Sequence, residues 1–149
     1  MAPPRAMIAI DTSLLVCAHR AGVCEHREAR RALESAAADA RGWGIGTPSL
    51  AEFWAIVTHP SAGGRPSTTD EASRFLLNLA DDANMAIWNP GPGFARRLLQ
   101  LATDLDVTGA RVFDLQIGLT AFDNGAHELW THDRHFVRIP GLRVHDPLA

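Results

Sequence analysis

The chain has 149 residues, of which 46% are hydrophobic and 21% are charged, and its formal net charge is −3. The length is typical of one domain, and the composition excludes a disordered segment. The negative charge argues against a basic coat along nucleic acid. All 14 basic residues are arginine, so a P-loop and a Schiff-base mechanism, which both need lysine, are excluded. We expect residues 1–149 to form a single domain.

Other features of the composition concern the cellular compartment. Cys17 and Cys24 have neither the spacing of a zinc site nor the density of a disulfide scaffold, so reduced thiols are expected. Residues 1–5 carry no pattern of a targeting signal, and no apolar run reaches the roughly 20 residues that cross a bilayer. These observations predict a soluble protein of the cytoplasm.

The hydrophobic pattern predicts alternating strands and helices. An apolar run at 7–10 is typical of a strand buried on both faces of a parallel sheet. The later predicted elements are helices at 12–18 and 25–40, a strand around Ile45, a helix at 48–58 capped by Thr47, a loop at 59–66, a helix from Thr68 or Thr69 to Ala80, a strand at 86–88, helices at 94–103 and 111–122, and strands at 129–131 and 142–144. This order predicts an α/β fold with a mainly parallel sheet covered by helices on both faces.

Two acidic residues stand where predicted strands end. Asp11 follows the strand at 7–10, and Asp133 follows the strand at 129–131. Open α/β sheets place their ligand crevices at the carboxyl ends of the strands, so both side chains are expected in one crevice. Each residue also has a structural alternative, since Asp11 could cap the following helix and Asp133 could form a turn.

Two further acidic residues fall on predicted helices. Glu52 is the only charge in the helix at 48–58, which is apolar on several sides, a pattern typical of a buried helix. Its alternatives are a capping box with Ser49 and plain exposure to water. Asp114 opens its helix on a face with small and apolar neighbours. The alternative for Asp114 is a first-turn acid favoured by the helix dipole.

Together the four acidic side chains predict one pocket. They are Asp11, Glu52, Asp114 and Asp133. Carboxylates held close together repel one another, and their pKa values rise unless a cation lies among them. An all-oxygen set suits Mg²⁺ or Mn²⁺ rather than zinc, which prefers Cys and His. His132 and His135 flank Asp133, but no companion Cys or paired His motif supports a zinc site.

The four acids stand in four short segments: residues 10–13 (IDTS), 49–53 (SLAEF), 112–116 (VFDLQ) and 131–136 (THDRHF). These segments resemble the PIN-domain family, specifically the VapC-type toxins of bacterial toxin-antitoxin pairs. They occur in the family's order, and the closing residues 138–144 also look similar, so the resemblance covers nearly the whole chain. It implies a PIN-like three-layer α/β/α sandwich whose mainly parallel central sheet has about five short strands.

The resemblance implies a Mg²⁺- or Mn²⁺-dependent endoribonuclease. Asp11, Asp114 and Asp133 are then metal ligands, and Glu52 is a further ligand or accepts a proton from water. The family often has a further acid where His135 stands, so the number of metal ions, one or two, stays open. The resemblance also implies a toxin held by an antitoxin, whose tail fills the acidic groove, and a homodimer.

Other side chains are expected to support this chemistry. Ser13, at a position where the family often has Asn, and Thr131 are expected to orient the acids. Several arginines are candidates for contact with RNA phosphates, although each is more simply a solvated surface residue. They are Arg27, Arg30, Arg31, Arg96, Arg97 and Arg134. The four tryptophans, in strands or apolar helices, are expected to pack in the core rather than stack on bases.

Two other functions stay open from the sequence alone. A strand-end Asp11 permits a metal-dependent phosphatase in which this residue is the nucleophile, but the similar haloacid dehalogenase-like pattern wants a second Asp where Ser13 stands. The other alternative is a non-catalytic module that binds RNA or a peptide on the same fold. The presence of all four acids speaks against it.

Overall fold

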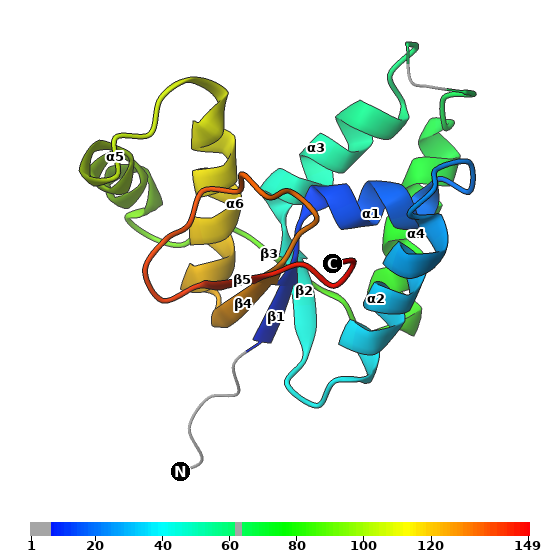
Figure 1. The fold of residues 1–149 in the computed structure, drawn as a ribbon, viewed down its shortest axis with the longest axis horizontal. Coiled ribbons are helices and arrows are strands. Elements are labelled where there is room, and N and C mark those ends of the chain that lie inside the picture. The colour runs from blue at the N-terminus through cyan, green and yellow to red at the C-terminus, as the bar shows by residue number, and fades with distance from the viewer. Residues whose placement is uncertain (1–6, 62–63) are drawn as a thin grey trace.

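The computed structural model describes residues 7–61 and 64–149, whose fold is drawn in Figure 1. Five strands form one sheet in the order β3-β2-β1-β4-β5, and every neighbouring pair is parallel. The strands are β1 (Met7–Ile10), β2 (Trp43–Gly46), β3 (Ala86–Trp88), β4 (Ala126–Trp130) and β5 (Arg143–His145). The parallel sheet predicted from the sequence is therefore confirmed, and all its strands end at the same edge.

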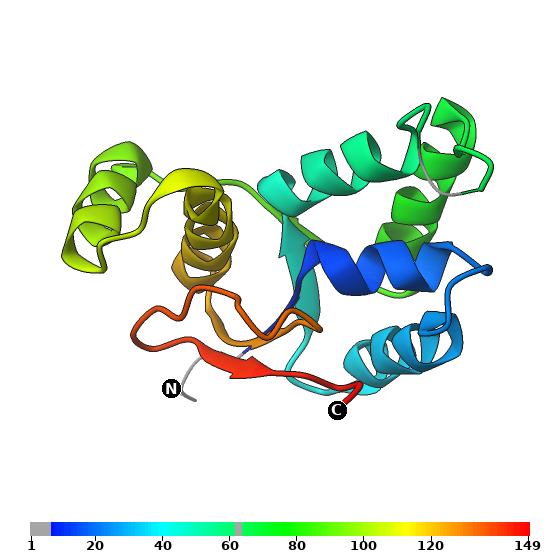
Figure 2. The ribbon, with the colours of Figure 1, turned by 45° about the horizontal axis from the view of Figure 1, so that its top comes forward.

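Helices lie on both faces of the sheet, so the three-layer prediction is also confirmed. In the described ranges they are α1 (Thr12–His19), α2 (His26–Ala38), α3 (Thr47–Val57), α4 (Thr69–Asp82), α5 (Phe94–Asp104), the short 3₁₀ helix η1 (Gly109–Arg111) and α6 (Val112–Asp123). Figures 1 and 2 show α1, α2 and α4 on one side, and α5 and α6 on the other.

Each face of the sheet has its own hydrophobic core, which explains why β1 is apolar at successive positions. Ile8 and Ile10 contribute to the core beneath α1 and α2, whereas Ala9 contributes to the core beneath α6. Neighbouring side chains of a strand point to opposite faces, so a strand between two layers must be apolar on both. Three tryptophans are at most 8% exposed, as predicted for core packing: Trp43, Trp88 and Trp130.

The predicted elements are found, and the differences lie mainly at their ends. Helix α3 begins at Thr47, so Gly46 rather than Thr47 is the N-cap, and no side chain caps the helix. The prediction of Thr47 as the cap is wrong because β2 ends at Gly46 and passes into the helix without a linking residue. Strand β4 begins at Ala126, before the predicted 129, because it pairs with β1 from Met7 onward.

Helix α3 also differs from the expectation that it is buried. Its buried residues are Ser49, Phe53 and Val57, whereas Ile56 is 42% exposed. The apolar outer side of α3 therefore remains on the surface, and composition alone could not distinguish it from the inner side.

Two predictions fall partly outside the described residues, namely the absence of a targeting signal at 1–5 and the loop that contains 62–63. Helix α4 begins as predicted, with a capping box between Thr68 and Glu71.

Over the ranges that the structure covers, no helix combines the length and the apolar character needed to cross a membrane. Cys17 and Cys24 are both free thiols.

Candidate active site

Asp11 lies at the end of the central strand β1, in the residue before α1. Its side chain is buried, with 6% exposure. Its Oδ2 atom accepts hydrogen bonds from Thr131 Oγ1 at 2.7 Å and from Ser13 Oγ at 3.3 Å. These are the two hydroxyls that were expected to orient the acids. Within the described residues no cationic side chain pairs with Asp11, so its negative charge is not offset.

The acids affect one another electrostatically. Burial raises the pKa of Asp11 from its ordinary value of 3.8 to about 6, although hydrogen bonds from Thr131 and the Thr12 backbone act in the opposite direction. The negative charges of Glu52 and Asp114 also raise the pKa of Asp11. The carboxylate therefore belongs to an acidic group with an excess of negative charge.

Asp114, in the first turn of α6, is part of the same group. Burial raises its pKa, and the charges of Asp133 and Glu52 raise it further, while a hydrogen bond from the Val137 backbone lowers it. That bond, from Val137 N to Asp114 Oδ2, is 3.4 Å long. All four predicted acids thus act on one another through Asp11 or Asp114.

Asp133 lies in the loop after β4, and its carboxylate is partly fixed by that loop. Its Oδ1 atom accepts a hydrogen bond from His135 N at 2.8 Å. Its own backbone N–H donates to Thr131 Oγ1 at 3.0 Å, the same hydroxyl that donates to Asp11. Thr131 therefore connects the loop of Asp133 to the carboxylate of Asp11.

Glu52 is half-buried on α3. The capping box that was its structural alternative is absent, because Ser49 Oγ is buried without a hydrogen-bond partner and α3 has no side-chain cap. A hollow of about 380 Å³ lies between α3 and α6 and is lined by Pro48, Ala51, Glu52, Phe113, Gln116 and Ile117. The exposed ring of Phe113 and the carboxylate of Glu52 thus border the same hollow.

A close approach between β2 and α6 helps to bring Glu52 toward Asp114. A Cβ atom added to Gly46 would lie 2.9 Å from Thr120 Cγ2, a distance that real Cβ atoms essentially never show. Gly46 directly precedes α3, the helix of Glu52, and Thr120 lies on α6, the helix of Asp114. A glycine at this position therefore permits the two helices to carry their acids to one edge of the sheet.

The residues present fit a divalent metal ion. The donor set consists of carboxylate oxygens, which Mg²⁺ and Mn²⁺ prefer, and the charge of Asp11 lacks a cation. Next to it, Thr12 Oγ1 is buried and has no hydrogen-bond partner. In residues 7–61 and 64–149 no three acidic, His or Cys side chains lie close enough to form a ready-made ligand cluster. The acids therefore form an open group rather than a closed cage.

Of the arginines considered for phosphate contact, Arg97 is already paired. Its NH1 group donates to Asp123 Oδ2 at 2.7 Å, and its NH2 group bonds the other oxygen of the same carboxylate. Arg27, Arg30, Arg31, Arg96 and Arg134 are exposed. Their contact with RNA stays a prediction.

A second buried carboxylate, Glu128 on β4, was not singled out from the sequence. It accepts hydrogen bonds from Trp130 Nε1 at 2.8 Å, Arg41 NH1 at 2.9 Å and Arg143 NH2 at 3.0 Å. Burial acts to raise its pKa, but these three donors outweigh burial and lower the pKa to about 2. The charge of Glu128 is thus compensated by its donors, and Glu128 joins Arg41, two residues before β2, to β4 and β5.

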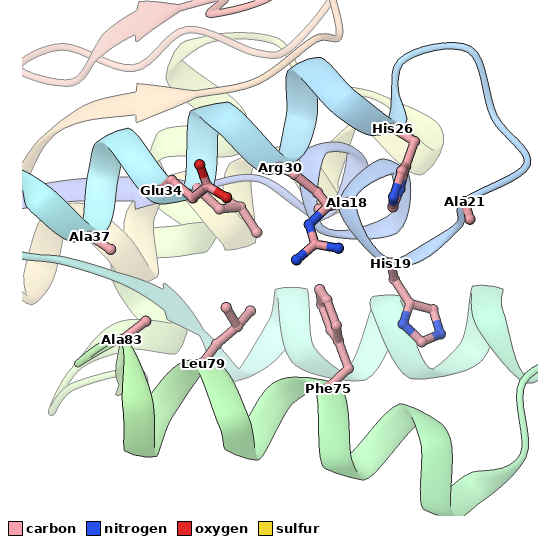
Figure 3. Close-up of a pocket in the computed structure, with 11 residues that line it drawn as sticks. Ala18, His19, Ala21, His26, Arg30, Glu34, Ala37, Phe75, Leu79 and Ala83 are labelled. Atoms are coloured by element: carbon pink, nitrogen blue, oxygen red, sulfur yellow. The ribbon is translucent and has the colours of Figure 1, made fainter.

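An apolar groove of about 380 Å³ lies between α1, α2 and α4, away from the acids. Figure 3 shows Ala37 of α2 opposite Leu79 and Ala83 of α4, with Phe75 farther along the groove. Two charged residues of α2, Arg30 and Glu34, line the same groove. Its chemistry differs from that of the acidic site and suits an apolar partner surface.

Comparison with known proteins gives the family. The model of the PIN domain matches residues 8–142. The chain belongs to the PIN-domain family. This PIN-domain protein is 34% identical over 143 residues to a VapC ribonuclease of Mycobacterium bovis and to ribonuclease VapC43 of Mycobacterium tuberculosis, covering 95% of this chain and 96% of each relative. It is therefore a ribonuclease of the VapC type, from a family whose members depend on a metal ion.

Solved structures confirm the fold of this PIN-domain protein. The VapBC2 complex of Rickettsia felis, bound to a promoter DNA fragment, has a TM-score of 0.69 and 20% identity over 94% of this chain and 98% of that chain. VapC20 of Mycobacterium tuberculosis, a toxin that cleaves the sarcin-ricin loop, has a TM-score of 0.65 and 15% identity over 87% and 92% of the two chains. At these identities the likeness concerns the fold alone.

Proposed function

We propose that this PIN-domain protein cleaves RNA internally with Mg²⁺ or Mn²⁺ and is the toxin of a toxin-antitoxin pair. The observation that carries the proposal is the buried Asp11 carboxylate, which has hydroxyl donors but, within the described residues, no cationic partner. Burial raises its pKa to about 6, and the charges of Glu52 and Asp114 contribute to the rise. A divalent cation relieves this excess of charge.

The four acids have distinct positions and therefore distinct roles. Asp11, Asp114 and Asp133 are the proposed metal ligands, and Glu52 is a further ligand or accepts the proton of the attacking water. A bound metal ion lowers the pKa of water and stabilises negative charge on the phosphate. Thr131 holds Asp11 in its rotamer through the 2.7 Å hydrogen bond. Ser13 gives a second, longer hydrogen bond to the same oxygen.

The test compares the wild-type protein with Asp11→Asn. Each is incubated with a structured RNA in Mg²⁺, in Mn²⁺ and in EDTA, and the new RNA ends are sequenced. We expect internal cuts by the wild type with either metal, none in EDTA, and a rate at least roughly 100-fold lower for Asp11→Asn. Asp70→Asn is the matched control, because Asp70 is an exposed residue of α4 that pairs with Arg74.

The alternatives give different results in the same assay. Cuts that persist in EDTA, or that Asp11→Asn makes at the wild-type rate, contradict the proposal. Release of phosphate from a phosphomonoester without RNA cuts identifies the phosphatase. Retention of RNA on a filter without cleavage identifies the binding module.

We infer that the antitoxin occupies two places on the chain. An amphipathic helix of the antitoxin fits the groove between α1, α2 and α4, since Leu79 and Ala83 offer an apolar wall and Arg30 and Glu34 offer charges. Helix-in-groove binding uses this combination of surfaces. An arginine from the antitoxin tail would neutralise the acids near Asp11. Two of the similar solved structures are toxin-antitoxin complexes, which supports a partner of this kind. The activity then belongs in the bacterial cytoplasm.

Two substitutions of the same kind test the groove. Leu79→Glu places a charge in the groove, whereas Leu99→Glu places one on α5, where Leu99 is already 67% exposed. We expect Leu79→Glu to weaken binding of the protein encoded next to this gene by roughly tenfold or more, and Leu99→Glu to leave it unchanged. Equal affinities of both variants would place the partner elsewhere.

The predicted homodimer also remains a proposal. Ile56 of α3 and Phe113 before Asp114 expose 42% and 55% of their surfaces on the two helices that border the Glu52 hollow. Light scattering of the purified chain, with Phe113→Ser as the variant, measures whether this surface joins two copies. A wild-type protein that is monomeric at all concentrations contradicts it.

A further inference from the structure

Beyond β5, the chain contacts the loop that carries Asp133. Strand β4 pairs with β5 up to Trp130 and His145, and the ladder continues with a hydrogen bond from Thr131 N to His145 O at 3.0 Å. His132 is the second residue after β4, and Asp146 is the first residue after β5. The hydrogen bond between Thr131 and His145 holds the two chain segments together where these residues follow.

The side chains of His132 and Asp146 are hydrogen-bonded. His132 Nδ1 lies 3.0 Å from Asp146 Oδ2 and 3.2 Å from Oδ1. Because a carboxylate only accepts hydrogen bonds, Nδ1 carries the proton and donates it. Asp146 is itself fixed, since its Oδ1 atom also accepts from Leu148 N at 2.9 Å. Leu148 packs against the core beneath α1 and α2. Asp146 is therefore an anchored acceptor.

His132 lies between the two residues that matter for the acidic site. Thr131, on one side, donates to Asp11, and Asp133, on the other, is one of the four acids. The His132 backbone N–H also lies 3.5 Å from Ser13 Oγ, the second donor to Asp11. A shift of His132 would thus move both Thr131 and Asp133 relative to Asp11.

We propose that Asp146 is a positioning residue of the nuclease, which acts through His132 to hold the loop of Thr131 and Asp133 against Asp11. This inference rests on the proposed metal-dependent function. Asp146 does not touch the acids, and its effect is transmitted by one side-chain hydrogen bond. Residues that orient metal ligands commonly change metal affinity by about 10- to 100-fold when they are removed.

The test is titration calorimetry of Mn²⁺ alone into metal-free protein. We expect Asp146→Ala and His132→Ala each to weaken Mn²⁺ binding by about tenfold, and the double variant to be no weaker than either single one, because both remove the same contact. Asp146→Asn is expected to bind within about twofold of wild type, since an amide oxygen in the position of Oδ1 can accept from both His132 Nδ1 and Leu148 N.

A control separates this effect from general loss of stability. Asp123→Ala also removes a carboxylate that binds a basic side chain, Arg97, but at the far end of α6. It is expected to lower the melting temperature without changing Mn²⁺ affinity. In cleavage assays at low Mn²⁺, Asp146→Ala should lose rate, excess Mn²⁺ should restore it, and the KM for RNA should not change.

Several results would overturn the inference. They are wild-type affinity in Asp146→Ala, additive losses in the double variant, or an Asp146→Asn protein as weak as Asp146→Ala. A wild-type protein that binds no Mn²⁺ overturns the proposed metal site and this inference with it. If the wild type binds Mn²⁺ and Asp146→Ala, His132→Ala and the double variant all bind it with the same affinity, this inference alone is overturned.

Discussion

Asp11, directly after β1, and Glu128, on the neighbouring strand β4, are two buried carboxylates with opposite surroundings. Glu128 accepts hydrogen bonds from Trp130 and from two arginines, which lower its pKa to about 2. Among the described residues, Asp11 accepts hydrogen bonds only from hydroxyl groups and a backbone N–H, and its pKa is about 6. Burial raises the pKa of both groups. The donors to Glu128 outweigh burial, whereas those to Asp11 do not, and the charges of Glu52 and Asp114 raise the pKa of Asp11 further.

The two carboxylates therefore affect the stability of the fold in opposite directions. The carboxylate of Glu128 contributes to stability, because removing it would leave Arg41 and Trp130 without a shared acceptor. The carboxylate of Asp11 reduces the stability of the metal-free fold at neutral pH, because its charged form is disfavoured there. Such an arrangement is typical of functional sites.

The largest expected effect on stability concerns Glu128→Gln. Because Arg41 and Arg143 are partly exposed, we expect a loss of about 2 to 3 kcal/mol in the free energy of unfolding at pH 7. The folded pKa lies below the ordinary 4.5, so this contribution is present above pH 4.5 and is lost as the pH falls toward 2. Urea unfolding at pH 7 and pH 3 measures it. An equal loss of unfolding free energy at pH 7 and pH 3 would contradict the assignment of this stabilisation to the charged Glu128 carboxylate.

The second effect has the opposite sign. Asp11→Asn should raise the free energy of unfolding of the metal-free protein by about 1 to 2 kcal/mol at pH 8. The folded pKa of Asp11 lies above 3.8, so its favourable contribution is present below pH 3.8 and is lost as the pH rises through 6. Wild type and variant should therefore converge near pH 4. Asp70→Asn, the exposed control, should show no such dependence, and a destabilised Asp11→Asn at pH 8 would refute the comparison.

The third effect, similar in size to the second, is that of the metal itself. Mg²⁺ at ten times its dissociation constant should stabilise the wild type by about 1.4 kcal/mol. Glu128→Gln should keep this increment, whereas Asp11→Asn should lose it. Thermal melts with and without Mg²⁺ measure the difference. If Glu128→Gln loses the increment while Asp11→Asn keeps it, the roles of the two carboxylates are reversed.

Much of this arrangement could be predicted from the sequence. The apolar run before Asp11 predicted a strand that is buried on both faces of the sheet. The structure places Asp11 at the carboxyl end of this strand, and Thr131 connects it to the loop of Asp133. The end of a strand can be predicted from the hydrophobic pattern of the residues next to it, and this pattern is visible in the sequence. That the four acids hold metal stays a prediction, supported by the electrostatic effects among them.

Other features depend on strand register, which no local pattern determines. Glu128 meets Arg143 because β4 and β5 pair these two positions, and Arg41 reaches them from the residue pair before β2. His132 and Asp146 lie just beyond the ends of β4 and β5, so their contact also depends on how these strands are aligned. The exposed side of α3 was also missed, because an apolar helix does not indicate which of its faces lacks a neighbour.

The strand order has a consequence for synthesis of the protein. Asp11 and its donor Thr131 are 120 residues apart along the chain, and β1 stays unpaired on one side until β4 exists. Long-range pairing of this kind forms late, after most of the polypeptide has left the ribosome. An incomplete nascent chain therefore lacks the assembled group of acids until Thr131 and Asp133 have been made.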